Sequence, residues 1–314
     1  MKKNKIKFSI ITCTYNRSNL LKKNIKSVID QKFDYFEHFI IDDGSTDNTE
    51  LTLKKYKHIK YIKLNKNYGQ PGAMYYSKVF KKISGDYIIL LDSDDILLFG
   101  AKKLIENTFQ SSKDKNIWTF SFDVKSPGRK KLNFQKRLIN SKNIYQDNHP
   151  RFNQGQGFQD FLDVRKKIFF DKFQEYFKSP KYWYSSFVEV NIRNNFNEFF
   201  INKKIALMSF GLNNVTQGHN FYKYAPITLH TRQYIFRNFK SYMEKKYYNY
   251  HLKSLILNQL IFPGYKLKNL KLLWKEMNKL SKKTDLGLFL ILLLVPSYFL
   301  FKIKKIIKLK RKQR

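Results

Sequence analysis

The sequence predicts an α/β domain built on a mostly parallel sheet with helices on both faces. Apolar runs of strand length alternate four times with helical segments within about the first 100 residues. This alternation is typical of parallel strands joined by crossover helices. Polar clusters follow the first, second and fourth runs, and right-handed crossovers place the carboxyl ends of such strands at one edge. We therefore expect the three clusters to meet in one crevice.

The individual elements follow from periodicity and from turn residues. The first predicted strand, residues 8–14, precedes an amphipathic helix for which Ser18 is the expected N-cap. The second strand, residues 36–41, ends at a turn in which Gly44 permits a sharp reversal. The later elements are a short helix to Tyr56, a strand at 59–64, a loop at 65–72, a helix at 73–83, a strand at 87–91 and a helix from about Phe99.

The strand predicted at residues 87–91 ends in three closely spaced carboxylates, on Asp92, Asp94 and Asp95. Its short apolar run is too brief for a typical helix and indicates a strand that is buried on both faces. In open α/β sheets, ligands bind beyond the carboxyl ends of such strands. Carboxylate oxygens are preferred by Mg²⁺ and Mn²⁺, so Asp92 and Asp94 are candidate metal ligands. A solvated acidic turn before the next helix is the alternative.

The chain of 314 residues is strongly basic, with 61 Lys and Arg against 24 Asp and Glu and a formal net charge of +37. This excess favours nucleic acid, anionic lipid or phosphorylated substrates as partners, although a composition typical of AT-rich coding accounts for part of it. The one cysteine, Cys13, excludes an internal disulfide and indicates a reducing compartment. No signal peptide is expected, and the six histidines are not spaced as zinc ligands.

Four polar motifs stand in a fixed order along the first part of the chain. They are Ser-Ile-Ile-Thr-Cys-Thr-Tyr-Asn-Arg at 9–17, Ile-Asp-Asp-Gly-Ser-Thr-Asp at 41–47, Asn-Tyr-Gly at 67–69 and Leu-Asp-Ser-Asp-Asp at 91–95. In order and spacing they resemble the nucleotide-binding half of family-two glycosyltransferases. The resemblance is strong over residues 7 to about 110, faint from there to about 232 and absent beyond. It implies the GT-A fold, a nucleotide-diphosphate sugar as donor and a divalent cation, Mn²⁺ or Mg²⁺, as cofactor.

The resemblance also implies roles for the residues of these motifs. Those implied to bind the nucleotide are Thr14, Tyr15, Asn16, Asp42, Asp43, Asp92 and Ser93, and those implied to hold the metal are Asp92, Asp94 and Asp95. Either Asp42 or Asp43 accepts a hydrogen bond from the base, and Asp94 ligates the cation that bridges the two phosphates. Many members have an Arg shortly after Asn-x-Gly, where this chain has Ala-Met-Tyr. That contact is therefore absent or supplied by Lys66 or Lys78.

The acceptor side is less well marked. Residues 111–160 are polar and irregular, and we expect acceptor-side loops there. Residues 165–177 resemble the helix that precedes the family's acceptor-site acid. Glu189 is the expected general base for the acceptor hydroxyl, with Glu175 and Asp163 as alternatives and a surface or core-edge acid as the non-catalytic interpretation.

The C-terminal part differs in composition, so we expect a GT-A domain at 1–232, divided near residue 110, and a helical extension at 233–314. Residues 286–301 form an almost unbroken apolar run that is short for a bilayer span and contains Pro296. The basic segment 302–314 is attracted to anionic lipid. We expect this tail to associate with the cytoplasmic face of the cell membrane, peripherally or as an anchor; a buried C-terminal helix is the alternative.

Together these features predict a hexosyltransferase that moves a sugar from a nucleotide-diphosphate donor to an acceptor hydroxyl with inversion. The tail favours a glycan or lipid-linked acceptor in cell-envelope polysaccharide or lipopolysaccharide assembly. An inactive relative that binds a nucleotide sugar stays open, because one carboxylate near 189 stands where the family has two. A basic nucleic-acid-binding protein is the second alternative, but several aspartates on one rim argue against nucleic acid as the partner.

Overall fold

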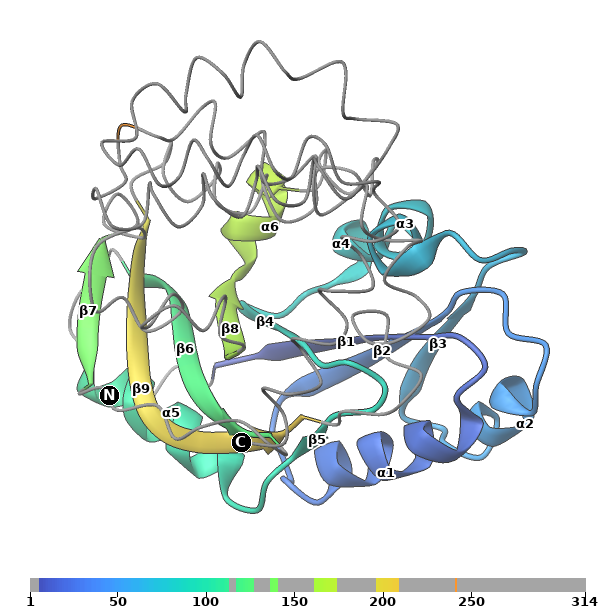
Figure 1. The fold of residues 1–314 in the computed structure, drawn as a ribbon, viewed down its shortest axis with the longest axis horizontal. Helices are drawn as coiled ribbons and strands as arrows, with labels where there is room; N and C mark the ends of the chain where they lie inside the picture. Colours follow the sequence, from blue (N-terminus) through green and yellow to red (C-terminus); the bar gives the residue numbers. More distant parts are fainter. Residues whose placement is uncertain are drawn as a thin grey trace, which may run out of the picture. The chain divides into compact units, whose positions relative to one another are not determined.

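In the part of the chain that the structure describes, the protein forms an α/β fold around a mixed sheet of nine strands. The computed structural model describes residues 6–112, 117–126, 136–140, 161–173 and 196–208, together with Ser241. The sheet runs in the order β3-β2-β1-β4-β8-β6-β9-β5, and β7 pairs with β9 at the side (Figure 1). The strands near one end of this order are parallel, and those near the other are mixed.

The parallel half contains the four strands that the sequence predicts. β1 (Phe8–Thr14) is central, with β2 (Phe36–Asp42) on one side and β4 (Tyr87–Leu90) on the other. β3 (Ile59–Lys63) continues the sheet beyond β2, again in parallel. The prediction of parallel strands with their carboxyl ends at one edge is confirmed for this half.

The other half was not predicted correctly. β8 (Leu162–Lys166) pairs antiparallel with β4 and with β6 (Ile117–Lys125). β9 (Asn197–Leu207) runs parallel to β6, and β5 (Ile96–Leu97) and β7 (Arg137–Asn140) pair antiparallel with β9. The sheet as a whole is therefore mixed, and the stretch expected to hold only irregular loops contains β6 and β7. Register shifts between β6 and β9 accompany the bend of β9 in Figure 1.

Helices cover both faces of the sheet, as predicted. Those on one face are α1 (Ser18–Ile29), α2 (Thr49–Leu53) and α5 (Ala101–Ser111), and those on the other are α3 (Gly69–Tyr76), α4 (Val79–Lys82) and α6 (Lys167–Phe173) (Figure 1). Alternation along β1 explains the two layers, because successive strand residues point to opposite faces. Ile10 packs with residues of α1 and α5, whereas Ile11 packs with residues of α3, α4 and α6.

Two helix boundaries differ from the sequence expectation. Ser18 is the first helical residue of α1, and Arg17 takes the N-cap position without a side-chain cap hydrogen bond; the Ser18 N–H donates to Asp47 Oδ2 at 3.2 Å. The helix predicted at 73–83 is divided into α3 and α4 at Lys78, whose φ of 53° is left-handed. α3 also begins earlier, at Gly69, because a proline in the first turn of a helix removes no intrahelical hydrogen bond.

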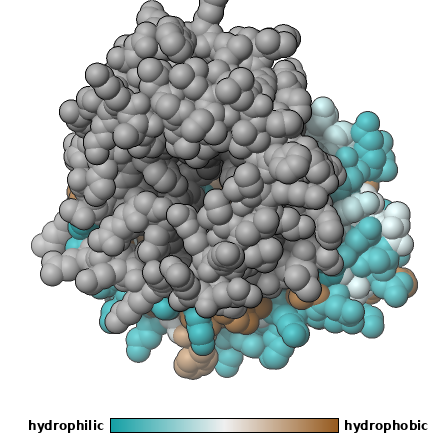
Figure 2. Space-filling view, in the orientation of Figure 1, coloured by the Kyte–Doolittle hydropathy of each residue, from teal (hydrophilic) through white to brown (hydrophobic). Residues whose placement is uncertain are grey.

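The chain divides into two compact units, Met1–Ile227 and Thr228–Arg314, and the helices and strands given above belong to the first. The predicted division at residue 232, the apolar run at 286–301 and the basic segment at 302–314 stay predictions, since residues 286–314 lie outside the described part. Over the described ranges, no helix is both long and apolar enough to cross a bilayer. The described residues visible in Figure 2 are mainly hydrophilic, with small hydrophobic areas along the lower margin.

Glu37 on β2 links three segments near the amino end of the parallel strands. Its buried carboxylate accepts hydrogen bonds from Ser9 Oγ at 2.6 Å, from the Ser84 N–H and hydroxyl, and from Lys60 Nζ at 2.6 Å. Burial acts to raise the pKa of Glu37, but these hydrogen bonds outweigh it and lower the pKa to about 2. The ionised carboxylate therefore stabilises the folded sheet.

Glu37→Gln is expected to lower stability most near neutral pH and less in acid. Glu37 has a depressed folded pKa, so its contribution is fully present above the ordinary value of 4.5 and is lost as the pH falls toward about 2. We expect the difference in unfolding free energy between wild type and variant to shrink by about 1 kcal/mol from about pH 7 to about pH 3.5. Urea unfolding at both pH values measures it, with the exposed Asp30→Asn as control. A difference that does not change with pH would contradict this role.

Candidate functional site

The loops that follow β1, β2, β3 and β4 lie together at the carboxyl edge of the parallel strands. β1 pairs with β2 on one side, where Thr14 lies opposite Asp42, and with β4 on the other. The backbone continues this pairing beyond the strands, because the Asp43 N–H donates to the Thr14 carbonyl at 2.9 Å and the Leu91 N–H donates to Ile11. The three predicted polar clusters therefore start from adjacent positions, as the sequence analysis expected.

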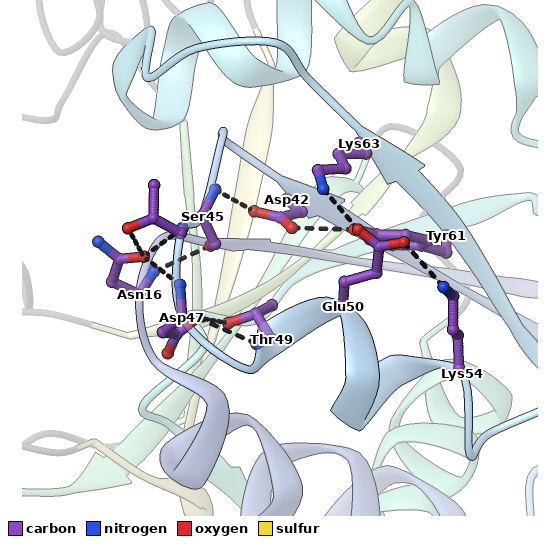
Figure 3. Close-up of polar contacts among 10 residues, drawn as sticks. Asn16, Asp42, Ser45, Asp47, Thr49, Glu50, Lys54, Tyr61 and Lys63 are labelled. Atoms are coloured by element: carbon purple, nitrogen blue, oxygen red, sulfur yellow. Dashed lines mark hydrogen bonds and ion pairs between the residues drawn. The ribbon is translucent and has the colours of Figure 1, made fainter.

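Asn16 joins the loop after β1 to the loop after β2 (Figure 3). Its Oδ1 accepts the N–H of Thr46 at 2.8 Å and that of Asp47 at 3.3 Å, and its own N–H donates to Ser45 Oγ at 2.9 Å. Asn16 has a φ of 51°, a left-handed conformation that asparagine adopts more readily than most residues. Thr14 is buried, whereas Tyr15 is 43% exposed.

Asp42 is fully buried, and both of its oxygens have partners within the protein. Oδ1 accepts the Ser45 N–H at 2.7 Å, and Oδ2 accepts the Tyr61 hydroxyl at 2.9 Å (Figure 3). Burial and the neighbouring Asp42 raise the pKa of the Tyr61 phenol, so it remains a donor. Nearby, Glu50 pairs with Lys63 and Lys54 at the surface. Asp42 thus fixes the turn that follows β2 against β3.

Asp43 organises the loop that follows β3. Its two oxygens accept the N–H groups of Tyr68 and Gly69, each at 2.8 Å. Burial raises the pKa of Asp43 above its ordinary value, although these two hydrogen bonds oppose the shift. The next residue, Gly44, has a φ of 79°, and a Cβ there would lie 2.7 Å from the Lys66 carbonyl carbon. Only glycine allows the two loops to approach this closely.

The segment 68–70 connects Asp43 to Asp92. Its first two N–H groups bind Asp43, and the side chain of Gln70 donates to Asp92 Oδ1 at 2.6 Å. Burial raises the pKa of the Cys13 thiol, and the negative charges of the nearby Asp92 and Asp43 raise it further. β2 and β4 flank β1, and the segment 68–70 joins the carboxylates that follow these two strands at the same edge of the sheet.

The turn at residues 92–95 is held from α1. Asn24 is fully buried on this helix, and its Nδ2 donates to the Asp92 carbonyl at 2.9 Å and to the Asp95 carbonyl at 2.8 Å. The Asp95 N–H donates to the Asp92 carbonyl at 2.9 Å, which closes the turn. Ser93 and Asp95 are buried.

Asp94 forms an ion pair across the site with Arg17 at the start of α1. The distance from Arg17 Nη1 to Asp94 Oδ1 is 3.0 Å, and the Asp94 side chain is 8% exposed. The guanidinium thus places a positive charge beside Asp94, the carboxylate that the resemblance implied to be a ligand of a divalent cation. Among residues that the structure describes, no group of three or more His, Cys, Asp and Glu is arranged to hold a metal. The oxygen donors nevertheless suit Mg²⁺ or Mn²⁺, which bind through one or two carboxylates and complete their shell with substrate phosphates and water.

Of the three acids expected on the acceptor side, the structure describes one. Glu189 and Glu175 lie outside the described residues, so their roles stay predictions. Asp163 is described on β8, where it is buried, accepts the Ser121 hydroxyl at 2.7 Å and pairs with Arg165. This cluster lies in the β6–β8 part of the sheet, and Asp163 is one residue beyond the pair of Val164 with Ile89, beside the carboxyl end of β4 that leads to Asp92 and Asp94.

The two lysines proposed in place of the family arginine occupy different positions. Lys66 lies in the loop after β3, with its Nζ 5.1 Å from the Tyr68 ring centroid. Lys78 is exposed at the break between α3 and α4.

Sequence reasoning assigned no role to Arg17, Asn24 and Gln70, although each binds a carboxylate or carbonyl of the 92–95 turn. Asn24 could have been noticed, because it is a polar residue on the apolar face of a helix, between Leu21 and Val28. Nothing local in the sequence marks the pairing of Gln70 with Asp92.

Comparison with known proteins agrees with this arrangement. The model of glycosyl transferase family 2 matches residues 9–177, more than half of the chain. The chain therefore belongs to glycosyl transferase family 2 and has an α/β fold of the GT-A type.

Several relatives are similar over about a third of the chain. The GalNAc(5)-diNAcBac-PP-undecaprenol beta-1,3-glucosyltransferase of Campylobacter jejuni is 38% identical over 99 residues, 30% of this chain and 32% of that protein. The poly(ribitol-phosphate) beta-N-acetylglucosaminyltransferase TarP of Staphylococcus aureus is 34% identical over 115 residues, 35% of this chain and 34% of that protein. The chain thus matches about a third of the length of these relatives.

The fold is similar to that of several solved glycosyltransferase structures. Residues 1–349 of S. aureus TarS in complex with UDP-GlcNAc superpose with a TM-score of 0.57 at 16% identity, covering 87% of this chain and 80% of that chain. The mannosyltransferase PcManGT of Pyrobaculum calidifontis, in complex with GDP-Man and Mn²⁺, gives a TM-score of 0.52 at 12% identity, covering 99% and 83%. At these identities the likeness concerns the fold.

Proposed function

We propose that this protein is a hexosyltransferase that moves a sugar from a nucleotide-diphosphate donor to an acceptor hydroxyl with inversion. One observation carries the proposal. The loops after β1, β2 and β4 meet at one sheet edge, where the segment 68–70 binds both Asp43 and Asp92. A crevice at the carboxyl ends of parallel strands is where α/β folds bind nucleotides.

The donor would lie across this edge. Thr14, Tyr15 and Asn16 would line the nucleotide pocket, and either Asp42 or Asp43 would accept a hydrogen bond from the base. The protein's own hydrogen bonds already orient both carboxylates, which reduces the conformational cost of binding. Asp92 and Ser93, at the end of β4, would lie beside the ribose.

Asp94, with Asp92 and Asp95 in the same turn, would hold Mn²⁺ or Mg²⁺. When bound, the cation neutralises charge on the departing diphosphate. The chain's own contribution is to orient the turn through Asn24 and to keep Asp94 next to a cationic partner until the donor arrives. Glu189 would then remove the proton of the acceptor hydroxyl.

The acceptor would be a glycan or a lipid-linked saccharide of the cell envelope. The relatives support this, since their names include an undecaprenol-linked substrate and poly(ribitol-phosphate). Action at the cytoplasmic face of the membrane agrees with the apolar and basic segments at 286–314. The basic segment 302–314 would attract the anionic lipid there.

A thermal-shift panel of nucleotide sugars with and without Mn²⁺ tests the proposal. A ligand that binds only the folded protein raises its melting temperature, so one donor should raise it, and more so with Mn²⁺. The donor found in this way is then incubated with lipid-linked saccharides, and release of the nucleoside diphosphate is measured. If no nucleotide sugar shifts the melting temperature, the proposal fails. Binding of a donor without transfer would identify an inactive relative instead.

A further inference from the structure

The ion pair between Arg17 and Asp94 connects the start of α1 with the 92–95 turn. Arg17 lies at the N-cap of α1, and its side chain is 26% exposed. Asp94 lies after β4 and is almost covered. Partial burial strengthens the attraction relative to an exposed pair, because water screens the charges less. Asp94 therefore has a strong partner before any ligand binds.

Other carboxylates of this region already accept hydrogen bonds from within the protein. Asp47 Oδ2 accepts the Ser18 N–H, and its Oδ1 accepts both the N–H and the hydroxyl of Thr49. Asp92 accepts the Gln70 amide. An arginine displaced from Asp94 would consequently turn toward another anion, and a planar guanidinium matches the oxygens of a phosphate group in a bidentate way.

We propose that Arg17 is a positioning residue that exchanges partners: it holds Asp94 while the cation is absent and passes to the donor's diphosphate when the cation takes Asp94. This inference rests on the proposed function and concerns the coupling of metal and donor at that same site. A divalent cation and a guanidinium on one carboxylate repel each other, so each disfavours the other. The diphosphate offers the released Arg17 a new anionic partner, which makes binding of cation and donor cooperative.

Direct measurement of Mn²⁺ binding, without turnover, tests the exchange. Arg17→Met removes the charge and keeps an apolar stem, and in the absence of nucleotide it should bind Mn²⁺ about tenfold more tightly than wild type. A tenfold change is expected if the ion pair is formed in about nine of ten wild-type molecules, because only the remaining tenth then has an Asp94 that is free to bind the cation. Arg17→Lys, which retains a cation, should remain near wild type. With UDP present the advantage of Arg17→Met should disappear or reverse, because the arginine then contributes to binding the diphosphate.

Lys23→Met is the matched control, since Lys23 is an exposed cation on α1, six residues after Arg17. It separates the loss of one positive charge in general from the loss of the pair with Asp94. Calorimetric titrations of all four proteins, with melting temperatures as a test of folding, complete the design. Equal tightening in Arg17→Met and Lys23→Met, unchanged Mn²⁺ affinity, or no Mn²⁺ binding by any of them with or without UDP would overturn the inference. If a nucleotide sugar still binds and is turned over in those cases, the proposed function stands while the exchange does not.

Discussion

Replacing Asp94 by asparagine is expected to lower the rate of sugar transfer by about 100- to 1,000-fold. Asparagine keeps the size of the side chain but removes the charge that would hold the cation against the diphosphate. Lewis-acid stabilisation of this kind is worth several kcal/mol in the transition state, and each decade of rate corresponds to about 1.36 kcal/mol. The measurement is kcat/KM for transfer at saturating Mn²⁺, with the donor identified by thermal shift.

Asp86→Asn provides the matched control for this experiment. Asp86 precedes the same strand at its amino end, where its carboxylate accepts the Lys7 N–H at 3.0 Å. It lies away from the edge that carries Asp94, so kcat/KM should be unchanged. Equal rates for wild type and Asp94→Asn across a range of Mn²⁺ concentrations would show that Asp94 does not act through a metal.

Asn24→Ala is expected to lower the free energy of unfolding by about 2–4 kcal/mol and to weaken donor binding at the same time. The substitution removes the Asn24 amide as donor to the carbonyls of Asp92 and Asp95, of which the Asp92 carbonyl keeps the Asp95 N–H, and a lost buried partner costs about 1–3 kcal/mol. The 92–95 turn, which carries the candidate metal ligands, loses its attachment to α1. Urea unfolding gives the first quantity and donor titration by calorimetry gives the second.

Two further variants separate the causes. Asn24→Leu fills the space of the side chain but cannot donate, so a loss similar to that of Asn24→Ala assigns the effect to the hydrogen bonds and not to a cavity. Asn19→Ala removes an exposed asparagine from the same helix and should change stability by less than about 0.5 kcal/mol. A fully stable Asn24→Leu that binds donor normally would refute the role of the Asn24 hydrogen bonds in holding the 92–95 turn.

The candidate site shows how far local patterns reach. The positions of Asp42, Asp43, Asp92 and Asp94 at the ends of strands could be predicted, because strand ends and turn residues are local features. Their partners could not be predicted. Tyr61 reaches Asp42 from the neighbouring strand, and Arg17 reaches Asp94 from a helix far away in sequence. No spacing rule relates such residues, since contact between them depends on how two loops cross.

The strands of the sheet likewise fall into a group that local patterns predict and a group that they do not. The parallel strands up to β4, and the edge at which the acids gather, follow from the alternation of strands and helices and from crossover handedness, so they could be predicted. β6, β8 and β9 were decided only by the tertiary structure, because strands in a mixed sheet pair over long separations and their polar residues are buried against one another, as Ser121 is by Asp163 and Glu198. A sequence records which residues favour a strand or a turn, whereas register, strand direction and the choice of ion-pair partner depend on the packing of the whole chain.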